Sequence, residues 1–154
     1  MESRIDYRQF NPEPLQALRA IEKYIAGCGL EHKFVHLLKL RASQINGCAY
    51  CIDMHSIEAR AAGETEQRLY ALGAWRETPF YDDRERAALA WIEAVTLVAE
   101  THVPDGVYEE AKKHFSEQEI VDLTYLAANI NVWNRLAIAL RAVPGRYRAA
   151  QATP

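Results

Sequence analysis

The amino-acid sequence predicts an all-α fold in a single domain. The chain has 154 residues and is nearly half hydrophobic, yet it contains only 7 glycines and 6 prolines, which favours long helices over many short strands. Apolar residues recur at helical spacing, and no segment shows a convincing strand alternation. We therefore expect one helical domain over residues 1–154, with an N-terminal arm at 1–10 and a frayed tail at 146–154.

Composition and charge exclude several classes of protein. The net charge of −3 argues against a nucleic-acid-binding surface, which would be basic. No apolar run approaches the roughly 18 residues that span a bilayer, so no membrane partner is expected. The first residues are charged and lack the apolar core of a signal peptide, and the cysteine count is odd. These features favour a cytoplasmic protein in a reducing compartment.

The first helix is predicted to begin at Asn11-Pro12, because asparagine can cap a helix and proline is tolerated in its first turn. Gly27 and Gly29 end it, and the intervening Cys28 is expected to be a packing residue.

The second helix is predicted from about Glu31 to Asn46. It is apolar around much of its girth, so we expect it to be central. His36 also lies on this helix, twelve residues before Cys48. Its simplest interpretation is a packing or surface histidine. Ser43-Gln44 is a polar patch that either lines a cleft beside the later cysteines or faces water.

The remaining helices are predicted from their caps and breaks. The third should run from Cys48 to Ala62 and end at Gly63. A short helix follows at 64–72, and an extended link leads to a helix capped by Asp82 or Asp83 that runs to about Thr101. The last two are expected from Pro104-Asp105 to Phe115, and from Glu117, after the capping box that Ser116 begins, to about Val143 before Pro144-Gly145.

Three asparagines interrupt the apolar pattern of this last helix, at Asn129, Asn131 and Asn134. A buried asparagine must find hydrogen-bond partners. We expect at least one of them to lie at a subunit contact or to line a site.

The strongest chemical signal is the pair Cys48 and Cys51, followed by His55. On one helix these residues stand at i, i+3 and i+7, on a single face. Gly47 supplies the break before the helix, so both cysteines fall in its first turn, where unpaired N–H groups favour a thiolate. A nearby imidazole can hold or relay the proton, which predicts a reactive dithiol.

Three other interpretations of the dithiol compete with this one. Two buried thiols can be structural. A zinc site would have three of its ligands here, but a structural site needs four and no second pair follows. A static disulfide within one turn would restrain little of the unfolded chain. A redox-active pair remains the best account.

Several runs of residues resemble the AhpD-like alkylhydroperoxidase core of the carboxymuconolactone decarboxylase superfamily. The resemblance covers nearly the whole chain after the first ten residues. The runs that carry it are Lys39-Leu40-Arg41-Ala42-Ser43-Gln44-Ile45-Asn46-Gly47-Cys48-Ala49-Tyr50-Cys51-Ile52-Asp53-Met54-His55, then residues 59–64, 75–81, 83–91 and 131–135.

The resemblance implies a helical subunit of a homotrimer or homohexamer with peroxidase activity. Cys51 would attack the peroxide, Cys48 would condense with the resulting sulfenic acid, and His55 would belong to the proton relay. A dithiol reductant, such as a lipoyl-bearing or thioredoxin-like protein, would reduce the disulfide. No cofactor or metal is expected, and we expect Cys51 to be the less exposed thiol.

Two positions depart from the family pattern. The relay glutamate, twelve residues before the first cysteine, is His36 here, and a second relay histidine of some members is Tyr50. Either His36 substitutes as the base or the peroxidase is weaker. A slow-turnover redox-sensing dithiol module is therefore an alternative, and decarboxylase chemistry on the same scaffold is another.

Overall fold

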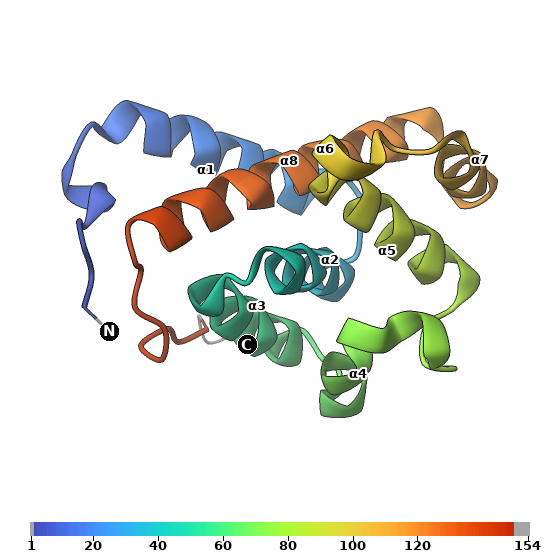
Figure 1. Cartoon of the computed structure of the whole chain (residues 1–154), viewed down its shortest axis with the longest axis horizontal. Coiled ribbons are helices and arrows are strands. Elements are labelled where there is room, and N and C mark those ends of the chain that lie inside the picture. Colours follow the sequence, from blue (N-terminus) through green and yellow to red (C-terminus); the bar gives the residue numbers. More distant parts are fainter. Residues whose placement is uncertain (1, 150–154) are drawn as a thin grey trace.

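The structure is a computed structural model that describes residues 2–149, and in these residues every regular element is a helix (Figure 1). This confirms the all-α prediction. The elements are η1 (Tyr7–Gln9), α1 (Pro12–Gly27), α2 (His32–Asn46), α3 (Ala49–Ala61), α4 (Glu66–Ala71), η2 (Leu72–Glu77), α5 (Asp83–Thr96), α6 (Val98–Thr101), α7 (Asp105–His114) and α8 (Glu117–Ala139).

Helix α2 is the centre of the molecule, as its apolar girth predicted. Every residue from 34 to 40 is buried, including the charged Lys39, and α2 packs against α3, α5 and α8. In Figure 1, α8 crosses the molecule on one side of α2, and α3 lies on the other. A polar group on α2 is therefore held inside the protein and must be satisfied there.

The turn between α2 and α3 positions the first cysteine. Gly47 adopts φ 68°, a left-handed conformation that glycine tolerates best, and its N–H donates to the Gln44 carbonyl at 3.2 Å. The Cys48 N–H donates to the Ser43 carbonyl at 3.0 Å, which completes the helix end. Cys48 then serves as the N-cap of α3, so the predicted break at Gly47 is confirmed.

The predicted capping box at Ser116 is confirmed, and Asp82, one of the two expected caps, forms a second box that was not predicted. Asp82 with Glu85 caps α5, and Ser116 with Glu119 caps α8. The prediction for Asn11 is wrong in detail, because Asn11 precedes α1 but its side chain makes no capping hydrogen bond. The expected single helix up to Thr101 is also divided, into α5 and α6.

Helix α8 ends at Ala139 rather than near Val143, so the predicted stop at Pro144-Gly145 is wrong. Arg141 turns the chain with a left-handed φ of 56°, and the Ala142 N–H donates to the Ala137 carbonyl at 2.8 Å. The chain then returns to α3, where the Gly145 N–H donates to Asp53 at 2.8 Å.

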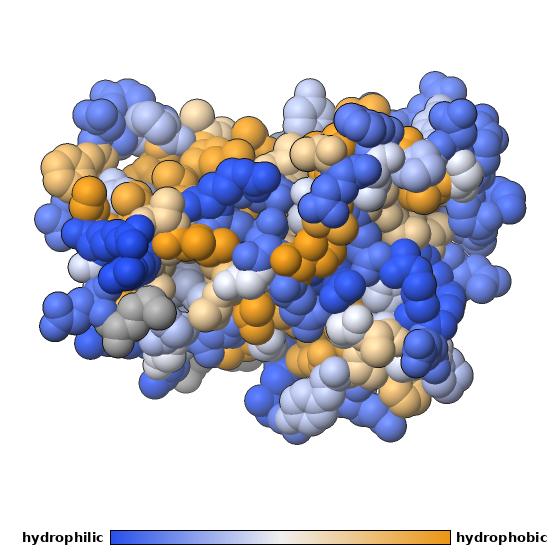
Figure 2. Space-filling view, viewed as in Figure 1, coloured by the Kyte–Doolittle hydropathy of each residue, from blue (hydrophilic) through white to orange (hydrophobic). Residues whose placement is uncertain are grey.

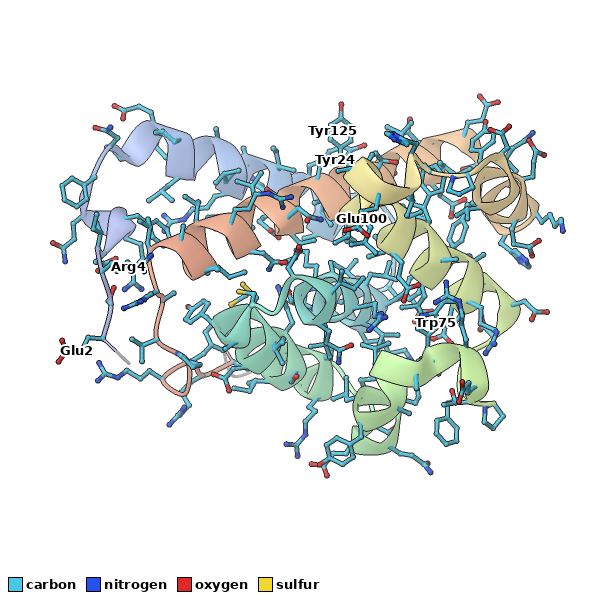
Figure 3. All side chains as sticks on the ribbon, in the orientation of Figure 1. Glu2, Arg4, Tyr24, Trp75, Glu100 and Tyr125 are labelled. Atoms are coloured by element: carbon cyan, nitrogen blue, oxygen red, sulfur yellow. The ribbon has the colours of Figure 1, made fainter. Side chains whose placement is uncertain are left out.

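Both ends of the described chain lie against the end of α8 and α3. The Arg4 N–H donates to the Leu140 carbonyl at 3.0 Å, and Figure 3 shows Arg4 beside the end of α8. At the other end, the Tyr147 hydroxyl donates to Glu58 on α3. The tail was expected to fray from residue 146, and residues 150–154 of it lie outside the described residues. Within residues 2–149 no helix has the length and apolar character needed to cross a membrane.

Candidate dithiol site

Cys48 is a buried sulfur at the N-terminus of α3, only 1% exposed. Its Sγ accepts the backbone N–H of Cys51 at 3.4 Å. A hydrogen bond from the Cys51 thiol, followed by backbone N–H groups of this first turn, lowers the pKa of Cys48 to about 7 although burial raises it. The position predicted for the dithiol therefore favours a thiolate at Cys48.

Cys51 lies one turn further along α3 and is 2% exposed. Its hydrogen bond to Cys48, together with burial, raises the pKa of the Cys51 thiol. As Cys48 loses its proton around neutral pH, the remaining proton of the pair is therefore held by Cys51 in the hydrogen bond between the two sulfurs. The expected difference in exposure is absent, because both thiols are buried. All three cysteines of the chain are free thiols in the structure.

His55 and His36 form a hydrogen-bonded pair of buried imidazoles. Their Nδ1 atoms are 3.2 Å apart, so one ring donates its proton and the other accepts it. Burial lowers the pKa of His36 to about 4, helped by the charges of His32 and Lys39, and burial also lowers the pKa of His55 well below its usual value. Both rings are therefore neutral at pH 7.

A cavity of about 390 Å³ joins these groups. Cys51, His55 and His36 line it, so the fold brings three of the four predicted site residues to one space, while Cys48 is not among its lining residues. The wall is completed by the arm before α1 and by α1, α2, α3, α8 and the chain after α8. Most of its surface comes from the apolar and aromatic residues Tyr7, Tyr50, Met54, Trp133, Ala137 and Tyr147, and the polar or charged residues are Glu22, His32, Lys39 and Glu58.

An ion pair between a buried lysine and a partly exposed glutamate in this wall was not anticipated from the sequence. Lys39 is 3% exposed and pairs with Glu22 of α1. The second oxygen of Glu22 accepts hydrogen bonds from Asn129 Nδ2 at 2.6 Å and Trp133 Nε1 at 3.0 Å, both on α8. Glu22 therefore stands fully partnered beside the imidazoles. Its place on α1 carries no motif, so only the tertiary contacts reveal it.

Asn134 connects α8 to the dithiol. It has no exposed surface, its Nδ2 donates to Ser43 Oγ at 3.0 Å, and its Oδ1 accepts from Asn46 Nδ2 at 2.8 Å. The hydrogen bond between the thiols is the larger influence, lowering the pKa of Cys48 and raising that of Cys51. Hydrogen bonding to Asn134 is a smaller influence that lowers the pKa of both thiols.

These contacts show where the polar residues of α2 and α8 find partners. None of the three α8 asparagines lines the cavity, and their place at a subunit contact stays a prediction. Ser43 is buried beside the cysteines rather than facing water, whereas Gln44 remains partly exposed. All three unusual asparagines of α8 are buried, with Asn131 donating to Thr96 Oγ1 at 3.1 Å.

Cys28 lies apart from this site, as expected of a packing residue. Its Sγ donates to the Ile25 carbonyl at 3.1 Å, and its side chain packs on the main core. Among residues 2–149 no group of three or more His, Cys, Asp or Glu side chains is placed to hold a metal ion.

Comparison with known proteins agrees with this architecture. Residues 12–94 match the carboxymuconolactone decarboxylase family. The uncharacterised protein YdfG of Bacillus subtilis is 43% identical over 140 residues, which cover 91% of this chain and 95% of that protein.

Solved structures show the same fold. A protein of unknown function from Agrobacterium tumefaciens, named as a candidate AhpD antioxidant-defence protein, superimposes with a TM-score of 0.91 at 46% identity, covering 95% of this chain and 100% of the other. An AhpD-core, peroxidase-related protein from Ralstonia eutropha superimposes with a TM-score of 0.78 at 19% identity, covering 88% and 73%. The chain therefore belongs to the carboxymuconolactone decarboxylase family, and within that superfamily it is AhpD-like.

Proposed function

We propose that this protein is a thiol-dependent peroxidase that reduces alkyl hydroperoxides with its dithiol. The family includes peroxidase-related proteins, which agrees with an enzymatic role at a coarse level. The observation that carries the proposal is the position of Cys51. It opens on a largely apolar cavity beside two neutral imidazoles, and it is hydrogen-bonded to a second thiol one turn away.

The chemistry balances with these groups alone. The Cys51 sulfur attacks the terminal oxygen of the peroxide, the O–O bond breaks, and the leaving alkoxide takes a proton, so Cys51 becomes a sulfenic acid. The Cys48 thiolate then attacks that sulfur, and water leaves as the disulfide forms. A dithiol reductant restores both thiols, and the sum converts a hydroperoxide and a dithiol into an alcohol, water and a disulfide.

Cys51 must lose its proton to become a nucleophile, and burial makes this loss unfavourable because it raises the pKa of the thiol. The proton of Cys51 can pass to Cys48, which is its hydrogen-bond partner, or to the imidazole of His55. The His36–His55 hydrogen bond lets the two rings exchange donor and acceptor roles, and the exposed His32 packs against His36 with ring centroids 4.6 Å apart. Two neutral imidazoles therefore stand within the cavity, and their shared hydrogen bond lets His55 take up or release a proton without carrying a lasting charge.

The test is consumption of cumene hydroperoxide with dihydrolipoamide as reductant. We expect Cys51→Ser and Cys48→Ser to lose turnover by roughly 1,000-fold or more, as when a nucleophile is removed. Cys48→Ser should still form one sulfenic acid at Cys51, detectable with dimedone and mass spectrometry. The matched control is Cys28→Ser, which should keep wild-type turnover. Full activity in both dithiol variants would refute the proposal.

A second candidate is a slow redox-sensing module with the same dithiol. It is favoured by the histidine at position 36, because a neutral imidazole stabilises an imidazolium at His55 less well than a carboxylate would. It predicts a reversible Cys48–Cys51 disulfide without appreciable turnover, and a partner that is released on oxidation. Decarboxylase chemistry, which gives the family its name, is not expected to require the thiol pair. It is therefore less favoured than either of the other two functions.

A further inference from the structure

We propose that the dithiol is reached from two sides, with the peroxide meeting Cys51 in the first cavity and the reductant meeting Cys48 through a second one. The inference rests on the proposed function and goes beyond it by assigning a binding site for the reductant. The occupant of the second cavity is a dithiol at the end of a narrow aliphatic arm.

The second cavity has a volume of about 390 Å³. It is lined by residues 47–50, at the start of α3, and by side chains between residues 137 and 144, at the end of α8 and beyond. Cys48 lines this cavity and Cys51 does not, while the reverse holds for the first cavity. Tyr50 and Ala137 line both, so they separate the two spaces together with the sulfurs.

The stereochemistry of disulfide exchange makes this division meaningful. A thiolate attacks a disulfide sulfur in line with the bond that breaks, so it approaches from the side opposite the leaving sulfur. Attack on Cys48 of a Cys48–Cys51 disulfide therefore requires space on the side of Cys48 that faces away from Cys51. The second cavity supplies space against Cys48 alone.

The chemistry of the second cavity suits an aliphatic arm. Its wall beyond Cys48 is mostly apolar, with contributions from Ile138, Ala142, Val143 and Pro144. Among residues 2–149, Arg141 is the one charged residue that lines it. Ile138 is 45% exposed, so the wall continues to the molecular surface. A long, uncharged chain ending in two thiols can lie along this wall without burying a charge.

Both exchange steps balance. The first thiolate of the reductant bonds to Cys48, the Cys48–Cys51 bond breaks, and Cys51 leaves with the electron pair and takes a proton. The second thiolate of the reductant then attacks its own first sulfur, and Cys48 leaves as the reductant closes into a cyclic disulfide. The lowered pKa of Cys48 favours it as the last leaving group, since thiols of lower pKa leave faster.

The experiment separates the two half-reactions. Oxidation of the reduced protein by cumene hydroperoxide and reduction of the preformed disulfide by dihydrolipoamide are each followed by rapid acid quench and mass spectrometry. Two variants place a bulky side chain in the second cavity: Ala142→Trp and, at a more exposed position, Ile138→Trp. Met54→Trp does the same in the first cavity. The control is Tyr70→Trp on α4, where the residue is 78% exposed and lies outside both cavities.

We expect Ala142→Trp and Ile138→Trp to slow reduction by roughly 10- to 100-fold, the cost of misplacing a reactant, and to leave oxidation unchanged. Met54→Trp should slow oxidation instead, and Tyr70→Trp should change neither. Wild-type reduction rates in both second-cavity variants, with folding verified by circular dichroism, would overturn the inference, as would reduction slowed only by Met54→Trp.

Failure of the proposed function would give a different result. If cumene hydroperoxide does not oxidise the thiols, the peroxidase proposal is wrong. The disulfide can then be formed with diamide, and the same variants still decide from which side it is reduced.

Discussion

At the scale of single residues, the substitution at position 36 shapes the chemistry of the site. The sequence shows only that a histidine stands where the family pattern has a glutamate. The structure shows this histidine hydrogen-bonded to His55 and facing the same cavity as Cys51. Its buried Nε2 has no hydrogen-bond partner among the described residues. A charge on His36 would therefore be poorly solvated, and Lys39 and His32 disfavour it further.

This depressed pKa makes stability depend on pH. His36 has a pKa of about 4 in the fold and about 6.5 in the unfolded chain, so the unfolded state binds more protons between these values. The free energy of unfolding is therefore unaffected by protonation of His36 above pH 6.5 and decreases as the pH falls through 6.5 towards 4. The loss is about 2–3 kcal/mol in the free energy of unfolding.

Urea unfolding of the wild type and of His36→Gln between pH 7.5 and 4.5 measures this loss. The variant should lose less stability than the wild type over the same range, because glutamine takes up no proton at position 36. Identical pH slopes for the two proteins would show that His36 is not held neutral by the fold.

At the scale of elements, the α2–α3 turn carries the geometry of the dithiol. Gly47 is needed because its backbone is left-handed. A larger side chain would fit in the space around it, since an added Cβ would meet nothing within 4 Å. The left-handed turn places Cys48 at the N-cap of α3, with the first-turn N–H groups pointing at its sulfur. The reactivity of Cys48 is thus tied to a helix end whose backbone has little freedom to change.

We expect Gly47→Ala to destabilise the protein by about 1–2 kcal/mol, the cost of a Cβ in the left-handed region. It should also slow alkylation of Cys48 by iodoacetamide at pH 7, because a displaced N-cap loses its hydrogen bonds. The matched control is Gly27→Ala, in α1, where φ is not positive and no clash arises. Equal melting temperatures for the two variants would contradict this account of the turn.

At the scale of the whole molecule, one outer face is more apolar than a small helical subunit requires. On α8, Val121, Tyr125 and Val132 are 47%, 53% and 40% exposed, and their spacing places them on one side of the helix. Tyr24 of α1 packs edge-on against Tyr125, with ring centroids 6.4 Å apart, and Figure 3 shows the two side by side. Figure 2 shows hydrophobic residues gathered between charged ones over the face on view.

We propose that this α1–α8 face, defined by the four residues just named, forms the contact of the expected homotrimer or homohexamer. Multi-angle light scattering should find a trimer or hexamer for the wild type at micromolar concentration. The double variant Val121→Lys/Tyr125→Lys should dissociate to a monomer, because two charges would be buried without partners. Tyr70→Lys, at a still more exposed position on α4 (78%), should leave the assembly intact. A monomeric wild type would refute the expectation.

The sequence by itself determined the helices, most of their ends and the placement of Cys48, Cys51 and His55 at the start of one helix. These features depend on neighbours within a few positions: apolar periodicity, capping residues and a glycine where φ is positive. The end of α8 escaped prediction because Arg141, and not the later proline and glycine, turns the chain.

Only the tertiary structure decided what surrounds the dithiol. Glu22 meets Asn129 and Trp133 across more than a hundred positions of the chain, and Asn134 reaches Ser43 from another helix. The pKa of each thiol and imidazole, and the division of the two sulfurs between two cavities, follow from burial and from charges that packing brings together. Local patterns carry no record of such contacts, because they arise only when helices distant in sequence close around one core.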